Sequence, residues 1–415
     1  MRAKTRERQV KKHFGKALQT PGLNNFQLCN RLGDRLLLDF PDLTGYTQGG
    51  LNVNESSNVM PKALITGASG FIGRHVVPHL LEKGYELRCL VRPTSDRSFL
   101  KQFPVEFADG DVMDPESLRR AVDSVEFVFH LAGVAQVVSS RRFFELHTQG
   151  TVNVAQACLQ TSHSPSHSPS NPPRFIHVSS LAAMGPARHT KPTLQPIREG
   201  AFARPVSPYG RSKHLAEKEL CDRADQLPCS IVRPPYVIGE GDHASEPLFR
   251  MIYKKRIHLI PGFFNNLYSF VHAADLAHLL AVVAEKGEIL TKNSLPGSPQ
   301  EDLPELGRGI YNASCGEFLK FGDFGRRIGQ AYGIEKIRVI HAPPMVCVGV
   351  GLYYETVKKL TGKSVPLDWN KVREALRGPW ICDDEKTRTQ LGFTPQPFGN
   401  RLEQTAKWYL ENGLF

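Results

Sequence analysis

Tyr209 and Lys213 are the pair of side chains in this sequence with the clearest catalytic chemistry. They stand four residues apart in the segment SPYGRSK, at residues 207–213, so on a helix both side chains would project from the same face. A free phenol has a pKa of about 10, and a tyrosine that acts as a general acid or base at neutral pH needs a nearby cation to stabilise its phenolate. Lys213 supplies that cation, so the pair predicts proton transfer to and from a substrate oxygen.

Two other tyrosines, Tyr332 and Tyr354, also have a lysine four residues later. Both lie beyond the last of the regularly spaced apolar runs, and neither has a serine pair upstream at the distance that separates Ser180 from Tyr209. We therefore interpret these two tyrosines as structural and Tyr209 as the catalytic one.

The glycines of the segment TGASGFIG, at residues 66–73, indicate a strand that turns tightly into a helix. Gly67 would allow the tight turn, Gly70 the close approach of the backbone to phosphate groups, and Gly73 the close packing of the helix on a sheet. The N-terminus of the helix would face the negative charge of the phosphates. The segment predicts a binding site for the pyrophosphate of a dinucleotide.

Short apolar runs alternate with helix-like segments along the chain, which predicts strands joined by helices. The runs are residues 63–65, 85–91, 125–130, 174–178 and 230–233. This pattern is typical of an α/β fold, a doubly wound parallel Rossmann-type sheet, here with a smaller C-terminal substrate-binding domain. Ligands bind beyond the carboxyl ends of such strands, so the polar segments that follow the runs are candidates for the site.

Low-complexity segments and motif positions predict how the chain is divided. The N-terminal part is expected to be a flexible extension or a mis-assigned start, and the next part a dinucleotide-binding domain with one loop insertion. The C-terminal part is expected to be mainly a substrate-binding and capping region, two segments of which return to the nucleotide domain. The boundaries are 1–59, 60–240 with the insertion 161–173, and 241–415 with the returning segments 270–285 and 308–313.

The composition is that of an ordinary globular protein, with 40% hydrophobic and 22% charged residues among 415. The net charge of +11 does not indicate nucleic-acid binding, because apart from a basic cluster at residues 2–16 it is spread along the chain, with no basic stripe interleaved with aromatic residues. Eight cysteines are scattered singly, which argues against a disulfide framework and a zinc site and favours a reducing, cytoplasmic setting.

The longest apolar run, residues 345–354, is shorter than the roughly 20 residues of a membrane-spanning helix. We expect this run to pack against its own domain. Weak contact with a membrane surface is the alternative interpretation.

In this combination and order, the motifs resemble the extended and atypical short-chain dehydrogenase/reductases, also called the NAD-dependent epimerase/dehydratase family. The resemblance spans residues 61–413 and rests on TGASGFIG at 66–73, GD at 110–111, HLAG at 130–133, GTVN at 150–153, HVSS at 177–180, Tyr209 with Lys213, RP at 233–234 and VHAAD at 271–275. It implies a small-molecule substrate and a homodimer. The pattern is most similar to the dihydroflavonol-reductase-like and 3β-hydroxysteroid-dehydrogenase-like branches, which mostly handle hydrophobic alcohols and ketones.

The resemblance also implies roles for individual residues. Tyr209 would be the catalytic acid/base, Lys213 would in addition hydrogen-bond the nicotinamide ribose, and Ser180 would hold the substrate oxygen. His147 stands where the family often has asparagine, and we interpret it as a packed helix histidine. The residues expected to bind the cofactor are Gly67, Ser69, Gly70, Phe71, Ile72, Gly73, Arg92, Asp111, Val112, Ala132, Gly133, Tyr209, Lys213 and Pro235.

The residues after the second predicted strand bear on the choice of cofactor. A carboxylate there would accept the 2′-hydroxyl of NAD and repel the 2′-phosphate of NADP, but this chain has Arg92. Thr94 and Ser95 could add hydroxyl donors, and Asp96 comes four residues later than Arg92. NADP is therefore the expected cofactor, with NAD as the alternative.

Sugar-nucleotide members of the family usually place asparagine and arginine where this chain has Tyr236 and Tyr268. The region instead offers an aromatic, apolar set that reads either as a substrate pocket or as domain core: Phe263, Phe264, Leu267, Tyr268 and Phe270. We expect an NAD(P)-dependent oxidoreductase that interconverts an alcohol and a ketone or aldehyde on a small flavonoid-, steroid- or isoprenoid-like substrate by hydride transfer. Two alternatives stay open, a nucleotide-sugar epimerase or dehydratase with retained NAD, and a non-catalytic NAD(P)-sensing protein.

Overall fold

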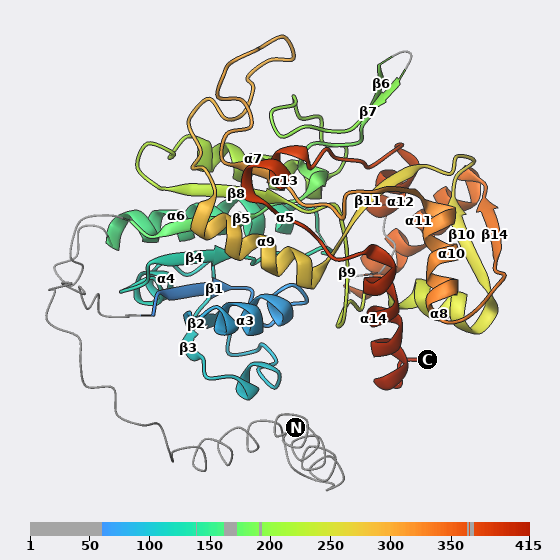
Figure 1. The fold of residues 1–415 in the computed structure, drawn as a ribbon, viewed down its shortest axis with the longest axis horizontal. Coiled ribbons are helices and arrows are strands. Elements are labelled where there is room, and N and C mark those ends of the chain that lie inside the picture. Colours follow the sequence, from blue (N-terminus) through green and yellow to red (C-terminus); the bar gives the residue numbers. More distant parts are fainter. Residues whose placement is uncertain (1–59, 138, 162–171, 191–192, 363–364, 366–368) are drawn as a thin grey trace, which may run out of the picture. The chain divides into compact units, whose positions relative to one another are not determined.

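The computed structural model describes residues 60–415, apart from residues 138, 162–171, 191–192, 363–364 and 366–368. The predicted N-terminal extension and nearly all of the predicted loop insertion lie outside the described residues. The described part combines a large parallel sheet, covered by helices on both faces, with a smaller mixed region built from later parts of the chain (Figure 1).

Seven strands form the central sheet, in the order β3-β2-β1-β4-β5-β8-β12, and every neighbouring pair is parallel. The chain winds outward in both directions from the centre of this order, which is the topology of a doubly wound Rossmann-type sheet. The predicted fold class is therefore confirmed. The bounds are β1 Lys62–Thr66, β2 Glu86–Val91, β3 Glu106–Asp109, β4 Phe127–His130, β5 Arg174–Val178, β8 Cys229–Arg233 and β12 Ile310–Asn312.

Alternation of side chains along the strands creates a hydrophobic core on each face of the sheet. In β1, Ala63 and Ile65 belong to the core that α3 and α9 cover, whereas Leu64 belongs to the core that α4, α6 and α7 cover. Burial on both faces explains why the strands read as continuous apolar runs. The helix bounds are α3 Gly73–Glu82, α4 Pro115–Ala121, α6 Gly150–Thr161, α7 Pro208–Cys221 and α9 Ala273–Lys286.

The start of α7 is fixed by its sequence. Ser207 is the N-cap, its hydroxyl accepts the amide of Gly210 at 3.0 Å, and Pro208 occupies the first helical position. Both choices favour a helix that begins at this point. The cap sets the orientation of the first turn, which carries Tyr209.

The smaller region contains a three-stranded sheet, β13-β11-β9, and a two-stranded parallel ribbon, β10-β14. Its core is aromatic, and Phe249, Phe270, Phe324 and Tyr409 are fully buried there. The bounds are β9 Tyr236–Ile238, α8 Glu246–Lys255, β10 Ile257–Pro261, β11 Leu267–His272, β13 Phe318–Lys320, α10 Phe321–Ala331, β14 Arg338–Ala342, α11 Pro344–Thr361, α12 Trp369–Leu376 and α14 Phe398–Glu411. The remaining short elements are η1 Leu100–Gln102, α5 Arg141–Phe143, the π-helical η2 Phe144–Gln149, η3 Leu181–Ala183, β6 Arg188–Thr190, β7 Thr193–Gln195 and α13 Glu385–Leu391.

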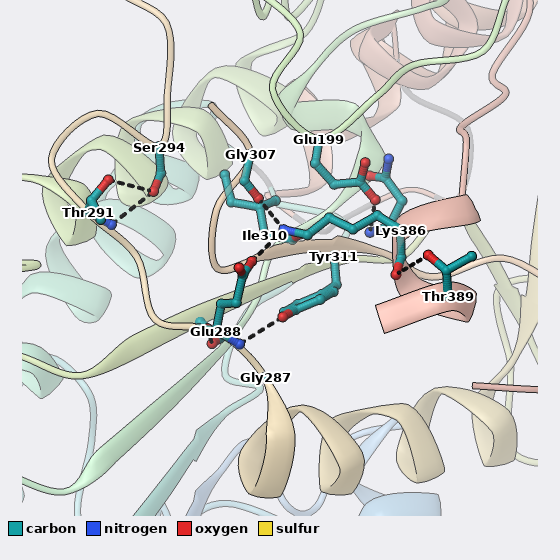
Figure 2. Close-up of polar contacts among 12 residues, drawn as sticks. Glu199, Gly287, Glu288, Thr291, Ser294, Gly307, Ile310, Tyr311, Lys386 and Thr389 are labelled. Carbon is teal, nitrogen blue, oxygen red and sulfur yellow. Dashed lines mark hydrogen bonds and ion pairs between the residues drawn. The ribbon is translucent and has the colours of Figure 1, made fainter. Parts of the chain in front are cut away.

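Lys386 on α13 ties the C-terminal part of the chain to the edge strand β12 (Figure 2). Its ammonium donates to the carbonyl oxygens of Gly307 at 2.6 Å and Ile310 at 3.2 Å. It also pairs with Glu288 at 3.0 Å and lies 4.7 Å from the centre of the Tyr311 ring. One cation therefore holds three separate segments together at the sheet edge.

Within residues 60–415, gaps aside, no helix is long and apolar enough to cross a membrane. Among the same residues, no cluster of His, Cys, Asp and Glu side chains has the arrangement of a metal site. The seven cysteines of this part of the chain are all free.

Candidate active site

A cavity of about 420 Å³ opens at the carboxyl ends of the central strands. Its walls come mainly from the segments that directly follow β1, β2, β3, β4, β5 and β8. Every residue predicted for catalysis or cofactor binding lines this one cavity: Gly67, Ser69, Gly70, Phe71, Ile72, Gly73, Arg92, Asp111, Val112, Ala132, Gly133, Ser180, Tyr209, Lys213 and Pro235. The fold thus brings together residues that are distant in the sequence.

The turn between β1 and α3 has room for glycine alone at two positions. Gly67 has a φ of +75°, and a Cβ atom there would lie 2.8 Å from the amide nitrogen of Ala132. A Cβ atom at Gly73 would lie 2.2 Å from the carbonyl oxygen of Ala68.

The start of α3 offers free donors to the cavity. Within the described part of the chain, the amides of Phe71 and Ile72 donate to no backbone carbonyl. Unpaired amides at a helix N-terminus bind anions. The turn and these donors therefore fit the pyrophosphate of a dinucleotide.

Asp111 and Val112 are held in the cavity wall after β3 by local hydrogen bonds. The Asp111 carboxylate accepts the amide of Met113 at 2.9 Å. The carbonyl oxygen of Val112 accepts the side-chain amide of Asn153 on α6 at 2.9 Å. The wall where Asp111 and Val112 are expected to bind the cofactor is thus held by a local turn and by α6.

Arg92 and Ser95 line the cavity after β2, whereas Thr94 and Asp96 do not. The Oδ1 atom of Asp96 accepts the amide of Ser98 at 2.9 Å and its hydroxyl at 2.6 Å. The carboxylate that could have bound a ribose hydroxyl is therefore engaged within its own loop. A cation and a hydroxyl group face the cavity instead.

Ser180, Tyr209 and Lys213 converge on one side of the cavity. The Ser180 hydroxyl accepts the amide of Ala182 at 3.2 Å, and it is one of the groups that lower the pKa of the Tyr209 phenol. Lys213 lies one helical turn after Tyr209 on α7, and its ammonium donates to the carbonyl oxygen of Val178 at 2.9 Å. The Tyr209 phenol, the Ser180 hydroxyl and the Lys213 ammonium therefore line the same part of the cavity.

The electrostatics of Tyr209 differ from the prediction. Burial raises the pKa of the phenol, and the groups that partly oppose this rise are Lys371 and Ser180, not Lys213. The reason lies in the direction of the Lys213 ammonium, which donates to the Val178 carbonyl. Contrary to the prediction, Lys213 is not among the groups that lower the pKa of the phenol.

Lys213 itself titrates in an unusual range. Burial lowers its pKa to about 8, and the charge of Glu217 opposes that fall. Its side chain is almost fully buried. Because this pKa lies close to neutral pH, the charge of Lys213 depends on its burial and on the neighbouring Glu217.

His147 has a hydrogen-bonding role that the interpretation as a packed helix histidine missed. It lies in the π-helical segment η2 and lines the cavity. Its Nε2 accepts the amide of Val134 at 3.0 Å, so the proton lies on Nδ1, which donates to the Ser212 hydroxyl at 2.9 Å. Burial, aided by the charge of Lys213, lowers the pKa of His147 to about 2, so the ring is neutral. It packs edge-on against the Tyr209 ring, with the centres 5.3 Å apart.

A buried ion pair beneath the site also escaped the sequence reasoning. Glu217 and Arg233 are both fully buried and form two parallel hydrogen bonds of 2.8 Å each. Glu217 also accepts the hydroxyl of Ser179 at 2.5 Å, next to Ser180. Burial raises the pKa of Glu217, but Arg233 and the hydrogen bonds lower it more, to about 2. The signal was present, because Tyr209, Lys213 and Glu217 follow one another at four-residue intervals on one helix face.

The helix α12, which belongs to the smaller region, approaches Tyr209 through Lys371. The Lys371 ammonium lies 5.2 Å from the centre of the Tyr209 ring and pairs with Glu374 at 3.2 Å. Glu374 in turn accepts a hydrogen bond from Ser207, the N-cap of α7. The helix α7, which carries Tyr209, is therefore held against α12.

The aromatic set predicted as pocket or core divides between core and surface. Phe270 is fully buried in the core of the smaller region, and Tyr268 packs against that core. Phe263 and Phe264 are 67% and 75% exposed. Among the described residues, none of this set lines the cavity.

The fold and the glycine turn define a Rossmann-type dinucleotide-binding protein. Residues 63–293, more than half of the chain, match the model of the NAD dependent epimerase/dehydratase family. The chain belongs to this family, whose members are NAD-dependent enzymes of the oxidoreductase and epimerase type.

Relatives of known name support this assignment. The chain is 32% identical over 351 residues to the ceramide reductase of Caulobacter vibrioides, covering 84% of this chain and 94% of the relative. It is 23% identical over 360 residues to sterol demethylase protein B of Methylococcus capsulatus, covering 85% of this chain and 99% of the relative. Among solved structures, the fold is shared by the dTDP-glucose 4,6-dehydratase DesIV of Streptomyces venezuelae, solved with NAD and TYD bound. The TM-score is 0.62 and the sequences are 21% identical, and the match covers 85% of this chain and 97% of that one.

Proposed function

We propose that this protein is an NADP-dependent oxidoreductase that interconverts an alcohol and a ketone or aldehyde on a hydrophobic substrate. The observation that carries the proposal is the convergence of Ser180, Tyr209 and Lys213 beside the glycine turn in one cavity. When bound there, the nicotinamide would supply the hydride chemistry. The protein would supply binding, orientation and the proton.

The side chains suit a reduction at neutral pH. Tyr209 donates its proton to the substrate oxygen, and Ser180, which lines the same cavity, orients the same oxygen. Because burial raises the pKa of Tyr209, the phenol keeps its proton until the substrate accepts it. Lys213 stands at the cavity wall as a donor for a ribose hydroxyl.

The wall after β2 supports NADP as the preferred cofactor. Arg92 faces the cavity, and its guanidinium can pair with a 2′-phosphate. Ser95 adds a hydroxyl donor, while Asp96 accepts hydrogen bonds from Ser98 and does not line the cavity. NAD would lose the phosphate contact and find no free carboxylate for its 2′-hydroxyl.

The substrate is proposed to be lipid-like. Two relatives are named for a ceramide and a sterol. Tyr236 and Tyr268 occupy the positions where sugar-nucleotide enzymes place polar groups, and the hydroxyl of Tyr236 is engaged by Ser245 at 3.1 Å. Two groups that would recognise a sugar diphosphate are therefore missing.

The first test is an assay of NADPH against NADH with a panel of steroid, long-chain and aromatic ketones. We expect turnover with NADPH and a clear preference for it over NADH. Turnover of nucleotide sugars without added cofactor, and no ketone reduction, would instead identify an epimerase or dehydratase.

The second test replaces the proposed acid. Tyr209→Phe should lower kcat by about 10²- to 10⁴-fold, because only the proton donor is removed, while NADPH binding followed by fluorescence stays close to that of the parent protein. Tyr332→Phe is the matched control, since Tyr332 has the same spacing to a lysine but lies outside the cavity. Equal turnover by both variants would remove the catalytic role of Tyr209, whereas unchanged biological activity of Tyr209→Phe with abolished turnover would favour a sensor.

A further inference from the structure

The helix α11 is inverted with respect to an ordinary surface helix. An amphipathic helix of a globular protein turns its apolar face inward and its charged face to water. In α11, Lys358 is only 4% exposed and pairs with Glu355 at 2.7 Å, whereas Met345 and Leu360 are 80% and 82% exposed. The Lys358–Glu355 pair thus faces the protein, whereas large apolar side chains face outward.

The outward residues form one continuous stripe at helical spacing, which we call the α11 stripe. It contains no carboxylate, and its single charged residue is Lys359 in the last turn. Leu352, Tyr353 and Val346 within it are 55%, 65% and 54% exposed. The members are Met345, Val346, Gly349, Leu352, Tyr353, Thr356, Lys359 and Leu360.

A second exposed apolar surface lies on the β10–β14 ribbon and the turn after it. Leu259 and Ile340 are opposite each other in the ribbon and are 42% and 43% exposed. Phe263 and Phe264 follow β10 and are more exposed still. By strand alternation, Arg338 shares the face of Ile340, so the charge on this surface is again basic.

Both surfaces adjoin α12, the helix whose Lys371 contacts the Tyr209 ring. Gly351 of α11 packs against Val372, where a Cβ atom would lie 3.0 Å from the valine methyl. On the other side, Gly262, next to Phe263, lies against Leu376, with a Cβ-to-methyl distance of 3.1 Å. The two exposed surfaces therefore flank the helix that touches Tyr209.

We propose that the α11 stripe and the turn at Phe263 and Phe264 dock this protein on the surface of an anionic lipid bilayer. Apolar side chains would enter the headgroup boundary, and Lys359 and Arg338 would meet the lipid phosphates. A second copy of the chain fits this surface less well, because in a symmetric contact between two such stripes neither stripe offers a carboxylate to pair with Lys359. As a consequence that rests on the proposed function, the lipid-like substrate reaches Tyr209 past α12 directly from the membrane.

The test uses the full chain and vesicles of phosphatidylcholine with and without phosphatidylglycerol. We expect co-flotation with the anionic vesicles and weak flotation with the neutral ones. The double variant Leu352→Glu with Leu360→Glu should reduce flotation by roughly tenfold or more, because two exposed leucines that would enter the headgroup boundary are replaced by charges that the lipid phosphates repel. Leu410→Glu is the matched control, since Leu410 is also exposed, at 43%, but lies on α14.

Activity separates the docking from the catalysis. The double variant should reduce a water-soluble ketone at the parental rate, and a long-chain ketone embedded in vesicles several-fold more slowly. Absence of parental flotation, or equal flotation of the double and control variants, would overturn the proposal even if the enzyme is active. Self-association of the parent chain without lipid, lost in the double variant, would assign the surface to a second copy instead. Flotation without any ketone reduction would leave the docking intact and refute the proposed function.

Discussion

At the scale of single residues, Glu217 links the two halves of the catalytic machinery. It holds Ser179 beside Ser180, and it lies one helical turn after Lys213, whose pKa it raises. Its own partner, Arg233, also donates to the carbonyl oxygen of Glu199 at 2.8 Å. The position of Ser179 and the pKa of Lys213 therefore both depend on one buried carboxylate.

Glu217→Gln should destabilise the protein by about 3–5 kcal/mol, because the Arg233 charge would stay buried without its partner. It should also lower the pKa of Lys213 below about 8, since the charge that raises it is gone. Chemical denaturation and the pH profile of activity measure the two effects. Glu219→Gln on the same helix is the control, because Glu219 is 40% exposed and its ion pair contributes little. A neutral effect of Glu217→Gln on both readouts would contradict this account.

Lys213 predicts a pH dependence of stability. Its pKa is about 8 in the fold and about 10.5 in the unfolded chain, so between these values the unfolded state holds more protons. Stability contributed by this group therefore rises with pH across that window, and below it the buried ammonium costs at most about 3 kcal/mol. Lys213→Met should stabilise the protein most below pH 8, with the gain shrinking towards pH 10.5. Urea denaturation of both proteins over this range checks the sign, and a gain that grows with pH would refute it.

At the scale of elements, the turn from β1 to α3 depends on close backbone contacts. Gly73→Ala would place a methyl group against the carbonyl oxygen of Ala68, and we expect a loss of about 1–3 kcal/mol of stability together with weaker NADPH binding. Gly399→Ala on α14 is the control, because a Cβ atom there meets nothing within 4 Å. Thermal unfolding and fluorescence titration give the two measurements. Unchanged binding by the first variant would mean that the turn can widen without cost.

The strands of the central sheet were predictable because they are buried on both faces. The run at 174–178 matches β5, and those at 85–91 and 125–130 differ from β2 and β4 by one or two residues at their starts. The smaller region was not predictable in the same way. Its strands β9 and β13 are three residues long and pair with β11, which is distant in sequence, so no local period marks them.

The site was largely predictable because its residues belong to motifs at strand ends. The roles of Glu217 and His147 were not, because they depend on partners from other elements, such as Arg233 and Val134. The electrostatic influence on Tyr209 was also misjudged, since sequence spacing does not reveal that Lys213 is directed to Val178 and that Lys371 approaches from α12. The apolar run at 345–354 forms the start of α11 and, contrary to the expectation of packing, leaves Met345 and Val346 exposed.

At the scale of the whole described molecule, the pair of Arg401 on α14 and Asp275 on α9 joins the smaller region to the sheet layer. Both side chains are nearly buried, with exposures of 12% and 7%, and one of their hydrogen bonds measures 3.0 Å. Arg401→Ala should cost several kcal/mol, because Asp275 would remain in place without its cation. Hydrogen exchange should then rise in α14 and α9 together. Faster exchange confined to α14 would show that the pair does not couple the two regions.

The chain passes between its two regions more than once, since α9 and β12 come after β9, α8 and β10. A gene fragment that ends near residue 240 would encode the glycine turn, Tyr209 and Lys213, yet it would lack the helix and the edge strand that cover the sheet. The segment that carries Tyr209 and Lys213 is therefore not expected to fold when it is separated from the rest of the chain. Recombination could exchange loops around them, but a hybrid enzyme would have to inherit the interleaved remainder as a single block.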